Sequence, residues 1–123
     1  MGQSTPFKPI ALVVEDDEMQ RELVSMLLEE SDMGVIQCDC AEAAFRVLEK
    51  MGGCFAMLFT DINLAGQIDG VELAHFVRQR FPEMRVIVTS GAGAGRSLPD
   101  GATFMPKPWL ALDVLREAER VRH

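Results

Sequence analysis

Short apolar segments alternate along this chain with longer segments in which apolar residues recur every three or four positions. The short segments are largely apolar, which is typical of parallel strands that helices cover on both faces. The longer segments have the spacing of amphipathic helices. The alternation predicts five strands, at residues 10–14, 35–38, 55–60, 86–88 and 103–105.

The first and last helices are predicted from their apolar positions. The first is expected to begin after the acidic run at residues 15–18, with apolar positions at Met19, Leu23, Leu27 and Leu28. We expect it to end near Gly34, because glycine readily adopts the left-handed conformation found at helix ends. The last helix is expected over residues 109–122, and its inner side is predicted to carry Leu112, Leu115 and Ala118.

Two further helices are predicted in the middle of the chain. One covers residues 41–51, and the other opens at Asp69 and Gly70 and ends before Pro82. No full helix is expected between the fourth and fifth strands, where residues 91–101 hold four glycines and a proline. Each interior glycine costs a helix about 1 kcal/mol relative to alanine, so this stretch is predicted to be a loop with at most one helical turn.

Strands that alternate with helices predict an α/β fold, in which a parallel sheet lies between two layers of helices joined by right-handed crossovers. Five short strands indicate a small doubly wound domain. The 123 residues fit one domain, 1–123, with a core at about 10–121. A chain of this length buries a sufficient core without disulfides or a structural metal.

Polar side chains are expected to gather at one edge of this sheet. In an open parallel sheet the functional crevice lies beyond the carboxyl ends of the strands. The polar residues at those ends are Glu15, Asp16, Asp61, Thr89, Ser90 and Lys107. Carboxylates that lie close together repel one another, and a hard divalent cation with oxygen ligands relieves the repulsion. The pattern therefore indicates a Mg²⁺ site.

The same cluster holds the groups that phosphoryl transfer needs. Asp61 would be the nucleophile and would form an acyl phosphate. Mg²⁺ would neutralise the incoming phosphoryl group, while Lys107 and Ser90 would hold its other oxygens. The sequence thus predicts a catalytic group made of Asp61, Lys107 and Ser90.

Four segments of the chain resemble the response-regulator receiver family of two-component signalling, in the family's order and at roughly its spacing. They are VVEDD (13–17), LFTDINLAGQIDG (58–70), VIVTSG (86–91) and FMPKPW (104–109). The resemblance extends from about Ile10 to Val121. It implies a flavodoxin-like fold with strand order 2-1-3-4-5, here with a short or missing fourth helix. It also implies a phosphoacceptor domain that catalyses its own aspartyl phosphorylation and dephosphorylation.

The resemblance further implies a role for each site residue. Asp61 matches the phosphorylation site, and Lys107 matches the family's lysine, which is followed by a cis peptide bond to proline. The implied metal ligands are Glu15, Asp16, Asp61 and the backbone carbonyl of Asn63. Ser90 matches the switch hydroxyl, with Thr89 as the alternative, and Phe104 matches the aromatic residue that changes rotamer with it.

The chain also departs from the family's pattern. The loop after Asp61 carries Leu64 and Ala65 where relatives usually have Met-Pro, and it is one residue longer. The missing helix removes part of the surface that relays phosphorylation in relatives. A degenerate receiver that only binds other proteins therefore stays an alternative. A phosphatase of the haloacid dehalogenase type is disfavoured, because its second aspartate would stand where this chain has Asn63.

Composition and charge limit the kinds of partner that the protein can bind and the cell compartment in which we expect it. The net charge of −7 argues against a nucleic-acid-binding surface, which needs clustered lysine and arginine. No apolar run reaches the roughly 18 residues of a membrane span. Residues 1–9 lack the apolar segment of a signal peptide, and the three cysteines form no CxxC pair, so we expect a cytoplasmic protein. The resemblance implies a sensor histidine kinase or a histidine phosphotransfer protein as the phosphoryl donor.

Overall fold

The computed structural model describes residues 8–93 and 95–122, and these residues form one sheet of five parallel strands. The strands are β1 (Ile10–Val14), β2 (Gly34–Cys38), β3 (Phe55–Asp61), β4 (Arg85–Ser90) and β5 (Thr103–Pro106). Their order, β2-β1-β3-β4-β5, is the predicted one. Residues 1–7, on which the signal-peptide argument mainly depends, lie outside the described residues.

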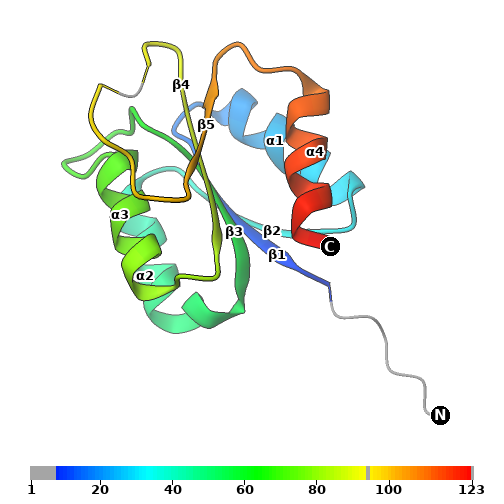
Figure 1. Ribbon diagram of the computed structural model, residues 1–123, viewed down its shortest axis with the longest axis horizontal. Coiled ribbons are helices and arrows are strands. Elements are labelled where there is room, and N and C mark those ends of the chain that lie inside the picture. The colour runs from blue at the N-terminus through cyan, green and yellow to red at the C-terminus, as the bar shows by residue number, and fades with distance from the viewer. Residues whose placement is uncertain (1–7, 94, 123) are drawn as a thin grey trace.

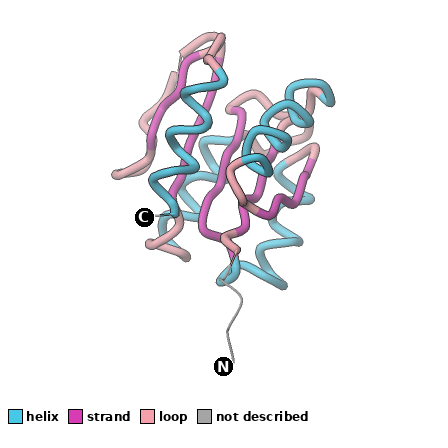
Figure 2. Tube along the Cα trace, turned by 90° about the vertical axis from the view of Figure 1, so that its right-hand side faces the viewer, coloured by secondary structure: helices cyan, strands magenta, loops and turns pink. Residues whose placement is uncertain are grey.

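Helices cover both faces of the sheet. They are α1 (Glu18–Glu30), α2 (Ala41–Met51), the short 3-10 helix η1 (Gly52–Cys54), α3 (Gly70–Arg80) and α4 (Ala111–Arg122). In Figure 1, α1 and α4 lie on one side of the sheet and α2 and α3 on the other; Figure 2 shows helices on both sides of the strands. The predicted doubly wound α/β fold is confirmed. Within the described residues, the helices lack the length and apolar character that a membrane crossing requires.

Side chains alternate along each strand between the two faces, and so they fill two separate hydrophobic clusters. The cluster beneath α2 and α3 takes from the central strands Leu12, Leu58, Val86 and Val88. The cluster beneath α1 and α4 takes from the same strands Val13, Phe59 and Ile87. All of these side chains are buried. The same alternation determines which polar residues at the strand ends share a face of the sheet.

The end of α1 differs from the prediction that placed it near Gly34. The helix ends at Glu30, and the residue in the left-handed conformation is Asp32, with a φ of 65°. Aspartate tolerates this conformation because its short polar side chain can bond locally. The amides of Asp32 and Met33 donate to carbonyls of the last helical turn, and the Met33 side chain is fully buried. Gly34 is already the first residue of β2.

Three of the apolar positions from which the first and last helices were predicted are exposed, and one of them, Leu112, was expected on the inner side. Met19 and Leu23 on α1 have exposed fractions of 83% and 43%, and Leu112 on α4 has an exposed fraction of 52%. Val24 and Val114 are buried in their place. Both helices carry apolar residues on more than one side, so the pattern alone does not decide which side packs on the sheet. That choice is made by the contact of α1 with α4 and with the strands.

The connection between β4 and β5, residues 91–102, is called the glycine-rich loop below. As predicted, its described part contains no helix. Three of its glycines have a positive φ, which is incompatible with an α-helix. Arg96 of this loop forms an ion pair with Asp69, and the carbonyl oxygen of Ser97 lies 2.9 Å from His75 Nε2. These two contacts fasten the loop to α3.

Helix α3 begins where the sequence predicts, at a capping box. The Asp69 side chain accepts the amide of Glu72 at 3.0 Å, and the Glu72 carboxylate accepts the amide of Asp69 at 3.3 Å. The amide of Gly70 donates to the carbonyl of Ile62 at 2.9 Å. A Cβ atom at Gly70 would lie 1.9 Å from the carbonyl oxygen of Asp61. Glycine at this position therefore lets the helix start close to the end of β3.

The substitution Gly70→Ala is expected to destabilise the protein by about 1–3 kcal/mol or more, because the added methyl group displaces backbone rather than a flexible side chain. Gly53→Ala is the matched control, since a Cβ at Gly53 would meet nothing within 4 Å. Urea unfolding of both variants measures the difference. Equal free energies of unfolding for the two variants would contradict the close approach of α3 to Asp61.

Candidate functional site

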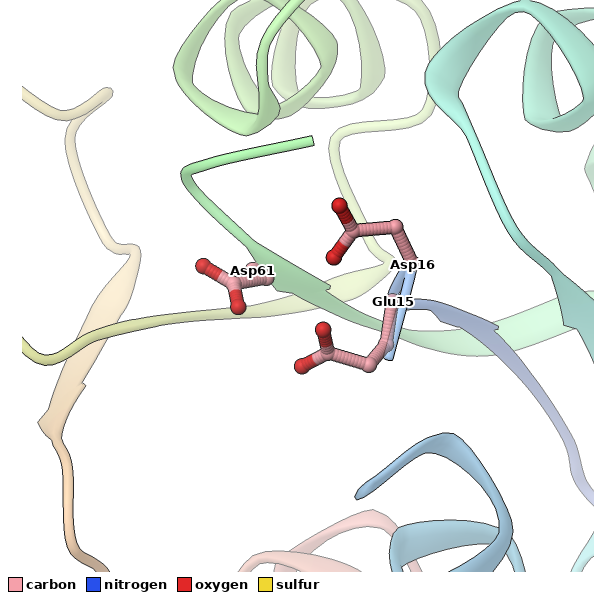
Figure 3. Close-up of side chains that lie close together, drawn as sticks. All are labelled: Glu15, Asp16 and Asp61. Atoms are coloured by element: carbon pink, nitrogen blue, oxygen red, sulfur yellow. The ribbon is translucent and has the colours of Figure 1, made fainter. Parts of the chain in front are cut away.

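Three carboxylates from two neighbouring strand ends meet at the carboxyl edge of the sheet. Glu15 and Asp16 follow β1 directly, and Asp61 is the last residue of β3. One oxygen from each carboxylate lies within 4.8 Å of the others, and Figure 3 shows the three side chains gathered together. Glu15 and Asp61 are 5% and 6% exposed, whereas Asp16 is exposed. The cluster therefore combines two buried acids with one that solvent reaches.

The ammonium group of Lys107 contacts both buried acids. Lys107 lies just past β5, and its amide donates to the carbonyl of Ser90 at 2.9 Å. Its Nζ donates to Asp61 Oδ2 at 2.6 Å and to Glu15 Oε1 at 3.2 Å. Burial alone would lower the pKa of Lys107, but its hydrogen bonds and charge interactions with the two acids outweigh burial and raise that pKa. The peptide bond from Lys107 to the following proline is cis, as the resemblance implies.

The second oxygen of Asp61 is bound by the backbone. Asp61 Oδ1 accepts the amide of Asn63 at 3.0 Å. Between these two residues, the amide of Ile62 donates to the carbonyl of Thr89 at 2.9 Å, which ties the chain after β3 to β4. One oxygen of Asp61 thus faces an ammonium group and the other a backbone amide, and these contacts orient the carboxylate.

Glu15 is an acid whose surroundings disfavour its charge. Burial raises the pKa of Glu15 to about 7. The charge of Asp61 adds to this rise, whereas the amide of Asp17, which donates to Glu15 Oε2 at 3.1 Å, and the charge of Lys107 oppose it. At neutral pH and without a bound cation, the carboxyl group of Glu15 is therefore protonated for part of the time.

This pKa predicts how stability depends on pH in the metal-free protein. The folded protein binds the Glu15 proton more tightly than the unfolded chain does, so the contribution of Glu15 to stability is complete below about pH 4.5 and is lost as the pH rises through about 7. Glu15→Gln removes this titration. The variant should therefore gain stability relative to the wild type between these values, by up to about 3 kcal/mol.

Urea unfolding in the presence of a chelator, at several pH values, measures this difference. Glu22→Gln is the matched control, because Glu22 is an exposed acid on the neighbouring helix α1. A difference between Glu15→Gln and the wild type that stays constant from about pH 4.5 to 8 would refute a raised pKa at Glu15.

Two hydroxyl groups stand at the end of β4, on opposite faces of the sheet. Thr89 pairs in register with Asp61, so the two side chains point to the same face. The Thr89 hydroxyl is buried and has no hydrogen-bond partner within the described part of the chain. The side chain of Ser90 points to the other face, and its Oγ accepts the amide of Ala92 at 3.1 Å. An unpaired hydroxyl therefore lies on the side of the acidic cluster.

Phe104 lies on the face opposite to the acidic cluster. It pairs in register with Val88 and packs, partly buried, against the hydrophobic cluster beneath α2 and α3. Ser90 follows Val88 by two positions and so shares this face with Phe104. The side chain of Asn63 is exposed beside the acidic cluster. The structure thus gathers Glu15, Asp16, Asp61 and Lys107 into one site, while Ser90 and Phe104 lie together on the other face.

Two residues next to the site, Arg21 and Asp17, make contacts that the sequence analysis did not predict. Arg21 Nη1 donates to the carbonyl of Glu15 at 2.9 Å, and its Nε donates to the side chain of Gln37 at 3.1 Å. Asp17 is the N-cap of α1 and accepts the amide of Gln20 at 3.0 Å. An arginine inside an amphipathic helix normally indicates a solvent-facing position. The acidic run before α1 was a signal for the cap, since acids favour helix N-termini.

The fold and the site together define a class: doubly wound α/β domains that hold a buried, lysine-paired aspartate among further acids at the carboxyl edge of the sheet. The family model of the response regulator receiver domain matches residues 11–115. The chain therefore belongs to the response regulator receiver family, a family of signalling domains in two-component systems.

Individual relatives differ in how much of their length this chain covers. The response regulator receiver protein CpdR of Brucella abortus is 29% identical over 119 residues, which are 93% of this chain and 96% of CpdR. The response regulator protein FleR of Pseudomonas aeruginosa is 35% identical over 83 residues, which are 68% of this chain and 17% of FleR. The chain thus spans nearly all of the first relative and about a sixth of the second.

Solved structures agree with the fold. The receiver domain of NtrX from Brucella abortus superimposes with a TM-score of 0.78 and is 29% identical, with 90% of this chain and 96% of that domain covered. A response regulator receiver domain protein from Clostridium thermocellum has a TM-score of 0.82 at 20% identity, with 92% and 93% covered. The second likeness, at this low identity, bears on the fold alone.

Proposed function

We propose that this chain is a phosphoacceptor domain in which Asp61 receives a phosphoryl group with the help of Mg²⁺. The observation that carries the proposal is the placement of Asp61. Its carboxylate is buried and oriented by a backbone amide and by the Lys107 ammonium, and two further acids lie beside it. An interaction domain without chemistry has no need for three clustered acids, two of them buried, beside one lysine.

The donor set fits a hard divalent cation. It consists of oxygens from three carboxylates that lie within 4.8 Å of one another, and Mg²⁺ prefers oxygen ligands. Asp16 and Asp61 would hold the cation, with Glu15 and the backbone carbonyl of Asn63 as further ligands. When bound, Mg²⁺ supplies positive charge against the oxygens of the incoming phosphoryl group.

The proposed transfer uses groups of this chain at defined atoms. A carboxylate oxygen of Asp61 attacks the phosphorus atom of a phosphohistidine, an O–P bond forms and the N–P bond breaks, and the released imidazole takes a proton from solvent. Lys107, which contacts Asp61 Oδ2, moves its ammonium onto a phosphoryl oxygen and offsets the added negative charge. Water later hydrolyses the aspartyl phosphate, which returns the domain to its starting state.

The donor would be a sensor histidine kinase or a histidine phosphotransfer protein in the cytoplasm, and residues 1–123 would act as a single receiver domain. The family membership supports this class of donor. Phosphorylation would switch a surface that other proteins bind. The glycine-rich loop starts directly after Ser90 and stands where relatives have their fourth helix, so we place the switch there.

A phosphorylation assay tests the proposal. The protein is incubated with acetyl phosphate and Mg²⁺, and its intact mass is measured over time. We expect the mass to increase by that of one phosphoryl group. No increase is expected when a chelator replaces Mg²⁺. An unchanged mass, together with no response of Trp109 fluorescence to Mg²⁺, would instead support the degenerate receiver. Trp109 suits this readout because it is two residues from Lys107 and its ring contacts Phe59.

The two hydroxyls of β4 are expected to differ in their effect. We propose Thr89, and not the Ser90 that the sequence favours, as the hydroxyl that binds the phosphoryl group. Thr89 shares a face with Asp61 and has no hydrogen-bond partner among the described residues. Thr89→Val should weaken beryllofluoride binding about tenfold, as expected for a lost hydrogen bond to a charged group. Ser90→Ala should change it less than about threefold. A larger loss of beryllofluoride binding in Ser90→Ala than in Thr89→Val would instead assign the phosphoryl-binding hydroxyl to Ser90.

A further inference from the structure

A wide cavity of about 870 Å³ opens at the end of the sheet opposite to Asp61. The starts of β3 and β4, the end of α3 and the end of α4 surround it. Strand β3 runs from Phe55 at this cavity to Asp61 at the acidic site. At about 3.3 Å per residue, that strand separates the two sites by about 20 Å. The cavity is therefore distinct from the proposed phosphorylation site.

Four arginines line this cavity, although the whole chain carries a net charge of −7. They are Arg78, Arg80, Arg85 and Arg120, and the one carboxylate in the lining is that of Glu83. Glu117 is buried and forms ion pairs with Arg85 at 2.6 Å and with Arg120 at 3.2 Å. The four arginines exceed these two acids by two positive charges, so the cavity is locally cationic.

Each of three guanidinium groups is held by a contact within the protein. Arg85 is fixed by Glu117 and by the hydroxyl of Thr103. Arg78 Nη1 donates to the carbonyl of Pro82 at 2.6 Å. Arg80 lies over two aromatic rings, at 5.6 and 6.0 Å from their centroids. Because these side chains are already ordered, a ligand that binds them loses little of its affinity to side-chain ordering.

Arg78 and Arg80 are the arginines of the cavity whose charge is free to pair with a ligand. The ion pairs found in the described residues include neither of them. Within the described part of the chain, Arg78 Nε is a buried donor that has no hydrogen-bond partner, so the protein does not use all the donors of this guanidinium. Both residues lie in the last turn of α3, where cations stabilise a helix, and this explains part of their presence. Arg85 and Arg120 are brought to the same cavity by the ion pairs that both form with Glu117.

The geometry points to a binding site for a polyphosphate chain, with Arg78, Arg80 and Arg120 as its ligands. Guanidinium groups bind phosphate oxygens in a bidentate manner, and several of them favour an anion with more than one phosphate. Gly53 also lines the cavity, and nothing lies within 4 Å of the position that a Cβ atom would take there, so a phosphate chain can approach the backbone at this point. The chain could come from inorganic polyphosphate or from a nucleoside triphosphate.

Calorimetric titration of the full chain with tripolyphosphate, ATP and orthophosphate tests this site. A chelator is present, so that no metal bridges phosphate to the acidic cluster. We expect tripolyphosphate and ATP to bind at least about tenfold more tightly than orthophosphate, with affinities that fall as salt is added. Equal affinities for the two long ligands assign the site to the phosphate chain alone, and tighter binding of ATP assigns it to a nucleotide.

Three variants locate the binding. Arg78→Gln combined with Arg80→Gln should weaken it at least about tenfold, whereas Arg46→Gln, an exposed arginine on α2 outside the cavity, should leave it unchanged. Glu83→Gln removes the lining carboxylate from an exposed position, and so it should strengthen binding without affecting folding. Absence of binding at millimolar ligand, or equal effects of the Arg46 and Arg78/Arg80 changes, would overturn the inference.

Discussion

Asp61→Asn is expected to remove all phosphorylation of the protein. The amide has no nucleophilic oxygen with which to form an acyl phosphate, so the phosphorylated fraction should fall below about 1% of the wild-type level under the same conditions. Mg²⁺ affinity should fall at least about tenfold, since one of the clustered carboxylates is lost. Intact mass after incubation with acetyl phosphate, and a Mg²⁺ titration, give the two measurements.

The same variant should fold at least as stably as the wild type without metal. Asp61 and Glu15 are buried acids that share one ammonium group, and removing one of them reduces their repulsion. Asp100→Asn is the matched control, because Asp100 is an exposed aspartate in the glycine-rich loop. Full phosphorylation of the Asp61 variant would mean that another residue is the acceptor, and the proposed mechanism would fail.

Lys107→Met is expected to lower both the rate of phosphorylation and the free energy of unfolding. Without the ammonium group, Glu15 and Asp61 remain buried with no cation beside them. Breaking a buried ion pair costs roughly 3–5 kcal/mol. We expect about 2 kcal/mol here, because the Lys107 side chain is 20% exposed and Glu15 can take up a proton. The rate of phosphorylation should fall about 100-fold, as when a charge-stabilising donor is removed.

Urea unfolding and the rate of mass gain measure these two losses. Lys50→Met is the matched control, since Lys50 is an exposed lysine on α2, and it should change stability by less than about 0.5 kcal/mol. Combining Lys107→Met with Glu15→Gln should recover part of the lost stability but none of the lost rate. If Lys107→Met alone left the stability unchanged, its ion pairs with the two acids would contribute nothing to folding.

The gathering of the site could be predicted because parallel strands place their carboxyl ends at one edge. Glu15, Asp16 and Lys107 follow strands and Asp61 ends one, and this position alone brings them together. The capped start of α3 at Asp69 could also be predicted, since aspartate is strongly preferred at the N-cap of a helix. These features depend on local sequence and on the order of strands.

The face on which each residue lies could not be predicted in the same way. Strand β4 is apolar on both faces, so its sequence has no alternation that would assign Thr89 and Ser90 to opposite sides. Only the register between β3 and β4 pairs Thr89 with Asp61. The end of α1 at Glu30 was missed for a related reason, because the burial of Met33 in the core decides where the helix stops.

The glycine-rich loop has a consequence for how tightly partners can bind. A helix at this position would present a preformed surface, whereas residues 91–97 are exposed where described and include three glycines. A partner that binds this segment must restrict the backbone of the loop, at a cost of about 1–2 kcal/mol of conformational entropy for each residue fixed. Complexes formed through this face should therefore be weaker than complexes with the same contacts to a preformed helix.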